Sequence, residues 1–332
     1  MRQPASRRGN QATGQALARR WRLPLLLVAM AWLLAGCAAM QTQALRAEAP
    51  SGLPPRVELA DTPFHAQEDY QCGPAALAML LQAAGKPVPP QQLVNEVYLP
   101  ARQGSLQPEM LASARRNGML GVTIAPDMRA LLAEVAAGHP VVVLQNLSLP
   151  LFPRWHYAVV IGYDLPAGDV ILRSGTTRRL VMSMSTFEHT WQRSQAWGMV
   201  ALPPGMLPAT SSPADISTAL LALDKNLPPA ATRPGWESAA RRWPEDAGLQ
   251  LGWGNSAYAA GDKASALEIF QAAAGRHPED VALLNNLASL LAESGRLQEA
   301  EPVARKAASL GGPLAPAAQA TLRDIQARLG QR

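Results

Sequence analysis

Residues 67–81 read QEDYQCGPAALAMLL, and this stretch is informative about both the fold and the chemistry of the chain. The apolar residues that follow Cys72 are good helix formers, and Pro74 stands in the first turn, where a missing N–H costs nothing. Gly85 then provides a stop signal, so the sequence predicts a helix over 72–84. The N-terminus of a helix presents free N–H groups and about half a unit of positive charge, and both lower the pKa of a thiol.

A thiol nucleophile needs a proton acceptor, and one of the five histidines is well placed for that role. His156 begins the segment HYAVVIGY (156–163), whose apolar run predicts a buried strand. A histidine at the mouth of a strand can face the start of a helix that packs on the sheet. His139, within a Gly-His-Pro turn, is expected to be solvated. Each residue alone is more often structural, but together Cys72 and His156 predict a nucleophile and its base.

The order of the predicted elements favours an α+β fold for a domain that we place at 57–203. The predicted helices come early in this domain, at 72–84, 90–98, 108–117 and 127–137. The predicted strands come mostly later, at 121–125, 141–145, 156–163, 170–173, 179–183 and 199–202. The Pro-rich segment 204–212 has the composition of a linker, and the periodicity beyond it is helical.

An internal repeat marks the C-terminal part of the chain. The segment RWPED (242–246) recurs 34 residues later as RHPED (276–280), and small residues recur at the same offset. This period resembles that of tetratricopeptide repeats, in which small residues let paired helices pack closely. We therefore predict an all-α tetratricopeptide-repeat domain over 213–332, with clear repeats at 247–280 and 281–314.

Residues 1–36 have the character of an export signal. They hold six arginines and no acidic residue, and the apolar run over 23–34 is too short to span a membrane. The run ends in LAGC, which resembles a bacterial lipobox and implies lipid attachment to Cys37. The alternative is an ordinary signal peptide or an anchor in which the cysteine occurs by chance. The next residue is Ala38 rather than Asp. By resemblance to the sorting rules of Gram-negative lipoproteins, this residue favours the outer membrane over retention in the inner membrane. Residues 37–56 are rich in Ala, Gln and Pro and predict a tether.

The basic character of the chain belongs to this signal. The chain has 30 Lys and Arg and 25 Asp and Glu, a net charge of +5, and six of the arginines lie within 1–36. The remainder is therefore close to neutral, and we expect no nucleic-acid partner. With one cysteine beyond the lipobox and no phosphate loop or HExxH motif, we expect neither a metal site nor a cofactor.

The segments QEDYQCGPAALAMLL and WHYAVVIGYD together resemble the bacteriocin-processing, double-glycine leader peptidase family of papain-like cysteine peptidases. The similarity is closer to the stand-alone members found in bacterial lipoproteins with tetratricopeptide tails, and it covers 57–203. It implies a papain-like fold in which Cys72 is the nucleophile and His156 the general base and acid. It also implies an oxyanion donor upstream of the cysteine, with Gln67 the best match and Gln71 the alternative.

The third catalytic position departs from the family pattern. Family members carry an Asp, typically followed by Pro, on the strand after the His hairpin, whereas Ser174 and Gly175 occupy that place here. Ser174 can accept a hydrogen bond from the imidazole of His156, but it has no charge to stabilise imidazolium. Asp164 and Asp169 are expected to be exposed turn carboxylates, too far along the hairpin to orient the ring.

The sequence thus predicts a lipid-anchored cysteine peptidase on the outer membrane, facing the periplasm, that hydrolyses bonds in a peptide or protein substrate. The repeats are expected to bind a substrate or a partner protein. The alternative is a weak or inactive pseudo-peptidase that acts as an interaction scaffold, which Ser174 favours. A transglutaminase-like or amidase activity of the same Cys–His pair stays open.

Overall fold

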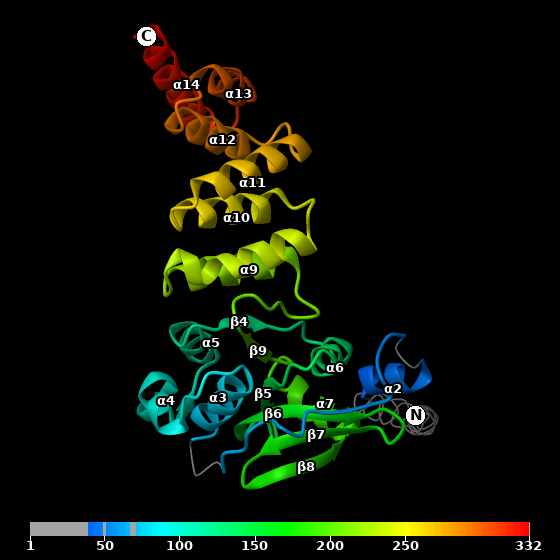
Figure 1. Cartoon of the computed structure of the whole chain (residues 1–332). Coiled ribbons are helices and arrows are strands. Elements are labelled where there is room, and N and C mark those ends of the chain that lie inside the picture. Colours follow the sequence, from blue (N-terminus) through cyan, green and yellow to red (C-terminus); the bar gives the residue numbers. More distant parts are fainter. Residues whose placement is uncertain (1–38, 49–50, 67–70, 332) are drawn as a thin grey trace, which may run out of the picture.

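The computed structural model describes residues 39–48, 51–66 and 71–331 (Figure 1). The predicted signal peptide over 1–36 and the predicted lipid attachment at Cys37 lie outside these residues. Within the described ranges, no helix combines the length and the apolar character that a bilayer crossing requires.

The chain divides into a part that contains the strands and a part built of helices alone. The strands are β1 (Arg56–Glu58), β2 (Tyr98–Leu99), β3 (Gly104–Ser105), β4 (Leu120–Thr123), β5 (Val141–Asn146), β6 (Trp155–Asp164), β7 (Asp169–Ser174), β8 (Thr177–Ser183) and β9 (Gly198–Leu202). The helices among them are α2 (Met40–Ala47), α3 (Cys72–Ala83), α4 (Pro90–Val97), the 3-10 turn Pro100–Arg102, α5 (Gln107–Arg116), α6 (Met128–Ala136) and α7 (Met184–Gln192). The helical part consists of α8 (Pro213–Asp224), α9 (Pro229–Arg242), α10 (Ala247–Ala259), α11 (Lys263–Arg276), α12 (Val281–Glu293), α13 (Leu297–Ser309) and α14 (Ala315–Gly330).

The main sheet is antiparallel and follows the order β4-β9-β5-β6-β7-β8. Strand β6 is the longest, and it pairs with β5 along its first half, where Gln145 lies opposite His156. Strand β1 pairs with the end of β6, beyond the residues that pair with β5, and Arg56 lies opposite Asp164. Early helices and a later antiparallel sheet confirm the predicted α+β class.

Helices cover both faces of the sheet, so the inner strands are buried on both sides. On β5, Val141 and Val143 pack into one core with α6 and α7, whereas Val142 and Leu144 pack into the other with α3 and α4. This alternation follows the two-residue period of a strand. In Figure 1, α3, α4 and α5 lie to one side of the sheet and α2 and α6 to the other.

Helix α3 packs against the face of the sheet to which β6 contributes Tyr157, Val159 and Ile161. Its residues from Gly73 to Leu81 are all buried, which explains why the segment is apolar almost all round. Gly73 is required sterically, because a Cβ there would lie 2.2 Å from the Oγ of Ser105 in β3. The fold therefore brings β3 directly against the first turn of α3.

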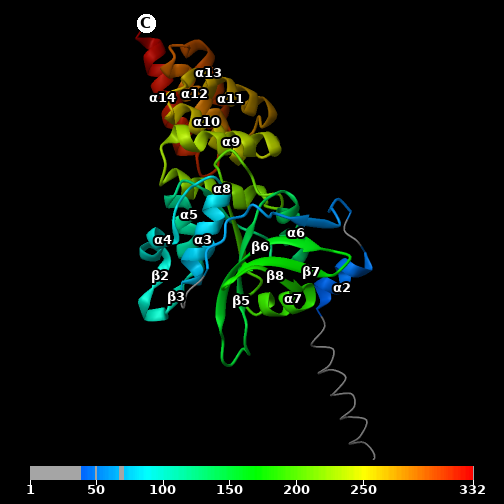
Figure 2. The ribbon, with the colours of Figure 1, turned by 60° about the horizontal axis from the view of Figure 1, so that its bottom comes forward.

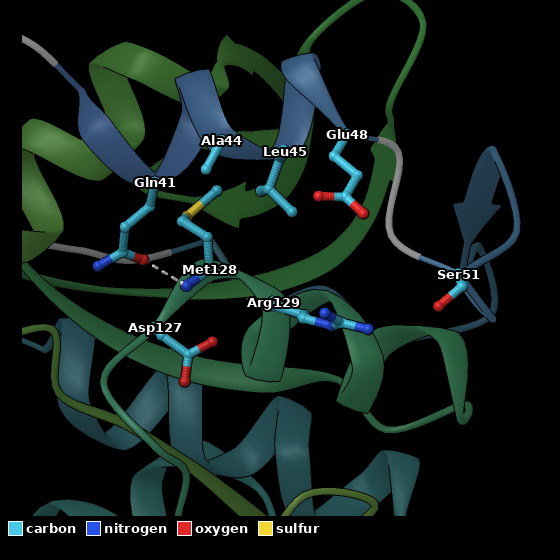
Figure 3. A pocket seen from close by; sticks show the side chains of 8 residues that line it. All are labelled: Gln41, Ala44, Leu45, Glu48, Ser51, Asp127, Met128 and Arg129. Atoms are coloured by element: carbon cyan, nitrogen blue, oxygen red, sulfur yellow. Dashed lines mark hydrogen bonds between the residues drawn. The ribbon is translucent and has the colours of Figure 1, made fainter.

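The segment predicted as a tether is instead held against the domain. Residues 40–47 form α2, whose first turn donates to the buried carboxylate of Glu188 in α7 through the Gln41 N–H at 3.0 Å and the Thr42 N–H at 2.7 Å. The Thr42 hydroxyl donates to the same carboxylate at 2.6 Å. On the other side, the Gln41 side chain accepts from the Met128 N–H at 2.6 Å, beside a pocket of about 300 Å³ between α2 and α6 (Figure 3). Glu188 has no exposed surface, so a flexible tether would leave its charge without these donors.

The predicted linker over 204–212 is likewise fixed. The buried carboxylate of Glu134 accepts from the N–H groups of Ala209 at 3.0 Å and Thr210 at 2.9 Å, and also from the Thr210 hydroxyl. His139 is buried, and its Nδ1 lies 2.9 Å from the same carboxylate. The prediction that His139 is solvated is therefore wrong. Burial alone would raise the pKa of Glu134, but the hydrogen bonds from His139, Ala209 and Thr210 outweigh it and lower the pKa.

The helices after the linker continue the core of the first domain rather than standing apart from it. Ile216 and Leu220 of α8 and Trp236 of α9 belong to the same core as Val200 of the sheet. From α9 to α14 the helices stack away from the sheet in antiparallel pairs (Figure 1). The helical part is therefore attached to the sheet by a continuous apolar core.

The 34-residue period has a local physical basis. In each copy of the repeated segment the last residue caps the next helix: Asp246 accepts from the Leu249 N–H and Asp280 from the Leu283 N–H. The turn within each pair contains a glycine with positive φ, as at Gly261. Capping and turn chemistry thus recur together and confirm the all-helical repeat region.

Replacing Glu134 by Ala should destabilise the protein strongly, because the N–H groups of Ala209 and Thr210 and the ring of His139 lose their common acceptor. Leaving a buried donor without its acceptor costs about 1–3 kcal/mol for each group. Urea unfolding at pH 7 measures the loss in the free energy of unfolding relative to the wild type. Because the folded-state pKa of Glu134 lies below the ordinary value of 4.5, its contribution is present above pH 4.5 and is lost as the pH falls through the folded-state pKa.

Glu293→Ala provides the matched control. Glu293 lies at the surface and accepts from the Tyr258 hydroxyl and the Lys263 ammonium, both at 3.0 Å. An exposed pair of this kind is worth at most about 1 kcal/mol. A loss for Glu134→Ala no larger than that of the control would contradict the proposed role of the buried carboxylate.

Candidate active site

Cys72 and His156 line one cleft of about 1140 Å³. Cys72 is the first residue of α3, and His156 is the second residue of β6. The cleft is completed by residues 102–107 beside β3 and by residues 193–195 after α7. The structure therefore brings together the thiol and the imidazole that the sequence paired across 84 positions.

The thiol of Cys72 lies among backbone donors. The N–H groups of Tyr157, Gly73 and Cys72 itself favour its thiolate form, and the side chain of Gln71, which precedes α3, makes no capping hydrogen bond that would compete for them. Burial nevertheless dominates and raises the pKa of the thiol. The predicted lowering of this pKa by the start of the helix is therefore wrong in the free protein, because desolvation outweighs the donors.

The imidazole of His156 is positioned by Ser174. Its Nε2 lies 2.8 Å from the Oγ of Ser174, at the end of the neighbouring strand β7. With a proton on Nε2 donated to that oxygen, Nδ1 carries the free lone pair. Burial, with a smaller contribution from the positive charge of Arg154, lowers the pKa of His156 to about 4. At neutral pH the site therefore holds a neutral thiol and a neutral imidazole.

The carboxylates near the hairpin do not contact the ring. Asp164 is eight residues along β6 from His156, a distance of about 26 Å along an extended strand. It pairs with Arg56 at 2.8 Å and lies opposite Asp169 in the sheet. Gln67, the predicted oxyanion donor, lies outside the described residues, and the alternative Gln71 directly precedes α3.

Several residues of the cleft carried no signal in the sequence. Arg102, Arg154 and Arg193 line it, and none of the lining residues that the structure describes is acidic. These cations come from three separate segments, so no sequence pattern connects them. Tyr157 reaches across the cleft wall to donate its hydroxyl to the Ser105 carbonyl at 3.1 Å.

The wall formed after α7 has an unusual backbone. Gln195 and Ala196 both have positive φ, at 60° and 51°, in a region that non-glycine residues seldom adopt. The buried Ser194 hydroxyl donates to the Leu144 carbonyl and ties this turn to β5. Strained backbone of this kind persists where its surroundings fix it, and here it shapes the side of the cleft.

Comparison with known proteins agrees with this organisation. Residues 59–198 match the model of the Peptidase_C39 like family, and residues 251–319 match that of the tetratricopeptide repeat. A putative C39-like peptidase from Bacillus anthracis is 21% identical, with a TM-score of 0.39, over 44% of this chain and 97% of that chain. The type III secretion translocator chaperone SycD of Yersinia enterocolitica is 18% identical, with a TM-score of 0.33, over 36% of this chain and 96% of that chain. No curated protein matches the chain.

Ser174→Asp should raise the pKa of His156 from about 4 toward or above its ordinary value of 6.5, because a carboxylate beside Nε2 stabilises imidazolium. Ser174→Ala should leave the pKa low, since burial is its main cause. NMR titration of the imidazole measures both values, with His156→Asn to assign the signal. A wild-type ring that titrates near 6.5, or an aspartate variant with an unchanged pKa, would contradict the described environment.

Proposed function

We propose that the Peptidase_C39-like domain at residues 59–198 is a cysteine peptidase that a lipid on Cys37 holds at the bacterial envelope, on the periplasmic side of the outer membrane. The observation that carries the proposal is the position of Cys72 and His156 in one cleft, with Ser174 fixing the ring. The lipobox and the signal supply the support for the location.

The chemistry begins from the neutral pair. Nδ1 of His156 takes the thiol proton as the sulfur of Cys72 attacks the peptide carbonyl carbon. The carbon–nitrogen bond then breaks, the imidazolium returns its proton to the leaving amine, and a thioester remains. Water attacks the thioester while His156 takes its proton. The carbon–sulfur bond breaks, and that proton returns to the thiolate with release of the acid.

Backbone donors at the start of α3 support the charged intermediate. The Cys72 N–H lies beside its own sulfur. We assign it as the first donor to the carbonyl oxygen that becomes negative. A donor of this kind is worth about 2.7–4 kcal/mol in the transition state. We assign the second donor to Gln67, from the resemblance to the leader peptidases. Ser174 orients the ring, but it offers no charge to the imidazolium that forms, which predicts modest turnover.

The charge of the cleft predicts the class of substrate. Arg102, Arg154 and Arg193 line it, and among its lining residues within 39–48, 51–66 and 71–331 none is acidic. A cleft lined by charges of one sign attracts ligands of the opposite charge, and its low-dielectric walls strengthen the attraction. We therefore propose acidic peptides or acidic segments of proteins as the preferred substrates.

The repeats supply the second activity of the chain. Tetratricopeptide repeats are protein-interaction modules whose stacked helices form extended surfaces. We propose that they bind the substrate protein or a partner. The segment at 204–212, which precedes the repeats, is fixed by Glu134. A protein bound to the repeats is therefore presented at a defined position relative to the cleft.

A scaffold without catalysis is the second candidate, and two observations favour it. Ser174 stands where family members carry an Asp, and burial raises the pKa of Cys72. Both features lower the fraction of reactive thiolate. In this interpretation the cleft binds an acidic segment without cutting it.

Digestion of a proteome-derived peptide library, read by mass spectrometry, separates the two candidates. We expect the purified chain to cleave peptides enriched in Asp and Glu, and both Cys72→Ala and His156→Ala to abolish the cleavage. Asp164→Asn, which changes a carboxylate outside the cleft, is the matched control and should retain activity. Cleavage that survives in Cys72→Ala, or an inert wild-type chain, would reject the peptidase in favour of the scaffold.

The pH dependence of an identified substrate tests the neutral pair. His156 must be unprotonated to accept the thiol proton, and its pKa is lowered to about 4. We therefore expect kcat/KM to stay level from pH 7 to about pH 5 and to halve near pH 4. Ser174→Asp should move the acid limb upward by the shift that it causes in the pKa of the ring. An acid limb near pH 6.5 in the wild type would contradict the mechanism.

A further inference from the structure

Residues 147–155, which comprise the connection between β5 and β6 and the first residue of β6, form a loop that exposes a group of large apolar side chains. Leu151 is 84% exposed and Phe152 75% exposed, and Leu147, Leu149 and Trp155 are exposed beside them. Single apolar side chains on a surface are ordinary, but a contiguous group marks an interaction site. The hairpin that carries the loop projects downward in Figure 2, away from the repeats.

The loop is built to hold this shape. The buried side chain of Asn146 accepts from the N–H groups of Ser148 at 3.0 Å and Arg154 at 2.9 Å, so one amide closes both ends of the loop. The Leu147 N–H donates to the Arg154 carbonyl, and the guanidinium of Arg193 donates to the Ser148 carbonyl at 2.9 Å. The apolar side chains are therefore presented by an ordered loop, and their exposure is a property of the fold.

The chemistry of the loop fits a bilayer surface. Arg154 stands within it and Arg193 at its base, and no acidic residue occurs between Val141 and Tyr163. Leucine and phenylalanine enter the boundary between headgroups and acyl chains, tryptophan settles at the headgroup level, and arginine binds anionic lipid.

The loop is connected through α7 to α2, which begins three residues after Cys37. Cys37 precedes Met40 by three residues, which span at most about 11 Å, and the first turn of α2 is bound to Glu188. From Glu188 to Arg193, which holds the loop, the chain advances five residues, or about 7.5 Å along a helix. Helix α7 thus links the residues next to the anchor to the base of the loop.

We propose that the loop over 147–155 inserts Leu149, Leu151, Phe152 and Trp155 into the same anionic membrane that holds the lipid on Cys37. The inference rests on the proposed lipid attachment. Since Arg154 and Trp155 also line the cleft, the opening of the cleft lies at the membrane surface. The substrates that reach Cys72 are then acidic segments presented close to the bilayer.

The test uses the lipidated full chain in vesicles of phosphatidylethanolamine and phosphatidylglycerol. An environment-sensitive fluorophore is attached at Phe152→Cys in a Cys72→Ala background. Leu310→Cys, at an exposed apolar position after α13, is the matched control. We expect the label at position 152 to shift its emission to the blue and to be quenched by brominated acyl chains, while the label at position 310 keeps its emission in water.

The lipid attachment is read separately, by palmitate labelling of the wild type and of Cys37→Ser. Wild-type labelling that Cys37→Ser abolishes, together with a water-like emission at position 152, overturns the insertion of the loop and leaves the anchor standing. An absence of palmitate on the wild type overturns the anchor, and the loop proposal falls with it. The same label is also measured with an acidic peptide in the absence of vesicles. An emission shift at position 152 that requires the peptide rather than lipid assigns the loop to substrate binding and also overturns the proposal.

Discussion

A carboxylate removed from water must be given hydrogen-bond donors inside the protein, and two such groups determine how the parts of this chain are joined. Glu188 takes its donors from the first turn of α2, and Glu134 takes its donors from Ala209 and Thr210. Each partner segment has the composition of a loose connection. Because both carboxylates are fully buried, the ends of the peptidase-like domain are fixed to its body, and the orientation of the repeats follows from that constraint.

The same balance between burial and donors decides the state of the cleft. At the start of α3 the backbone favours a thiolate on Cys72, yet the apolar surroundings outweigh it, and His156 loses its affinity for a proton for the same reason. Both groups therefore favour their neutral forms in the free protein. The serine at position 174 fits a site in which the ring is held in place but its positive charge is not stabilised in advance.

Much of the fold was predictable because its signals are local. The strand at 156–163, the helix that begins at Cys72 and the 34-residue period all follow from residues close together in the chain, and the structure contains each of them. The sequence misjudged α2, the segment at 204–212 and His139, since what holds them is a partner elsewhere in the chain. The donors on α2 and their acceptor Glu188 are about 146 positions apart, and no periodicity reports such a contact.

The sequence by itself determined the chemical identities: a cysteine at the start of a helix, a histidine at the start of a strand, and repeats whose Asp caps recur every 34 residues. The tertiary structure alone decided which atoms meet and how strongly each proton is held. It placed Ser174 on the Nε2 side of His156 and gathered arginines from three segments around one cleft. The physical reason is that desolvation and hydrogen bonding depend on neighbours that are remote in sequence, whereas capping, turns and strand periodicity depend on neighbours along the chain.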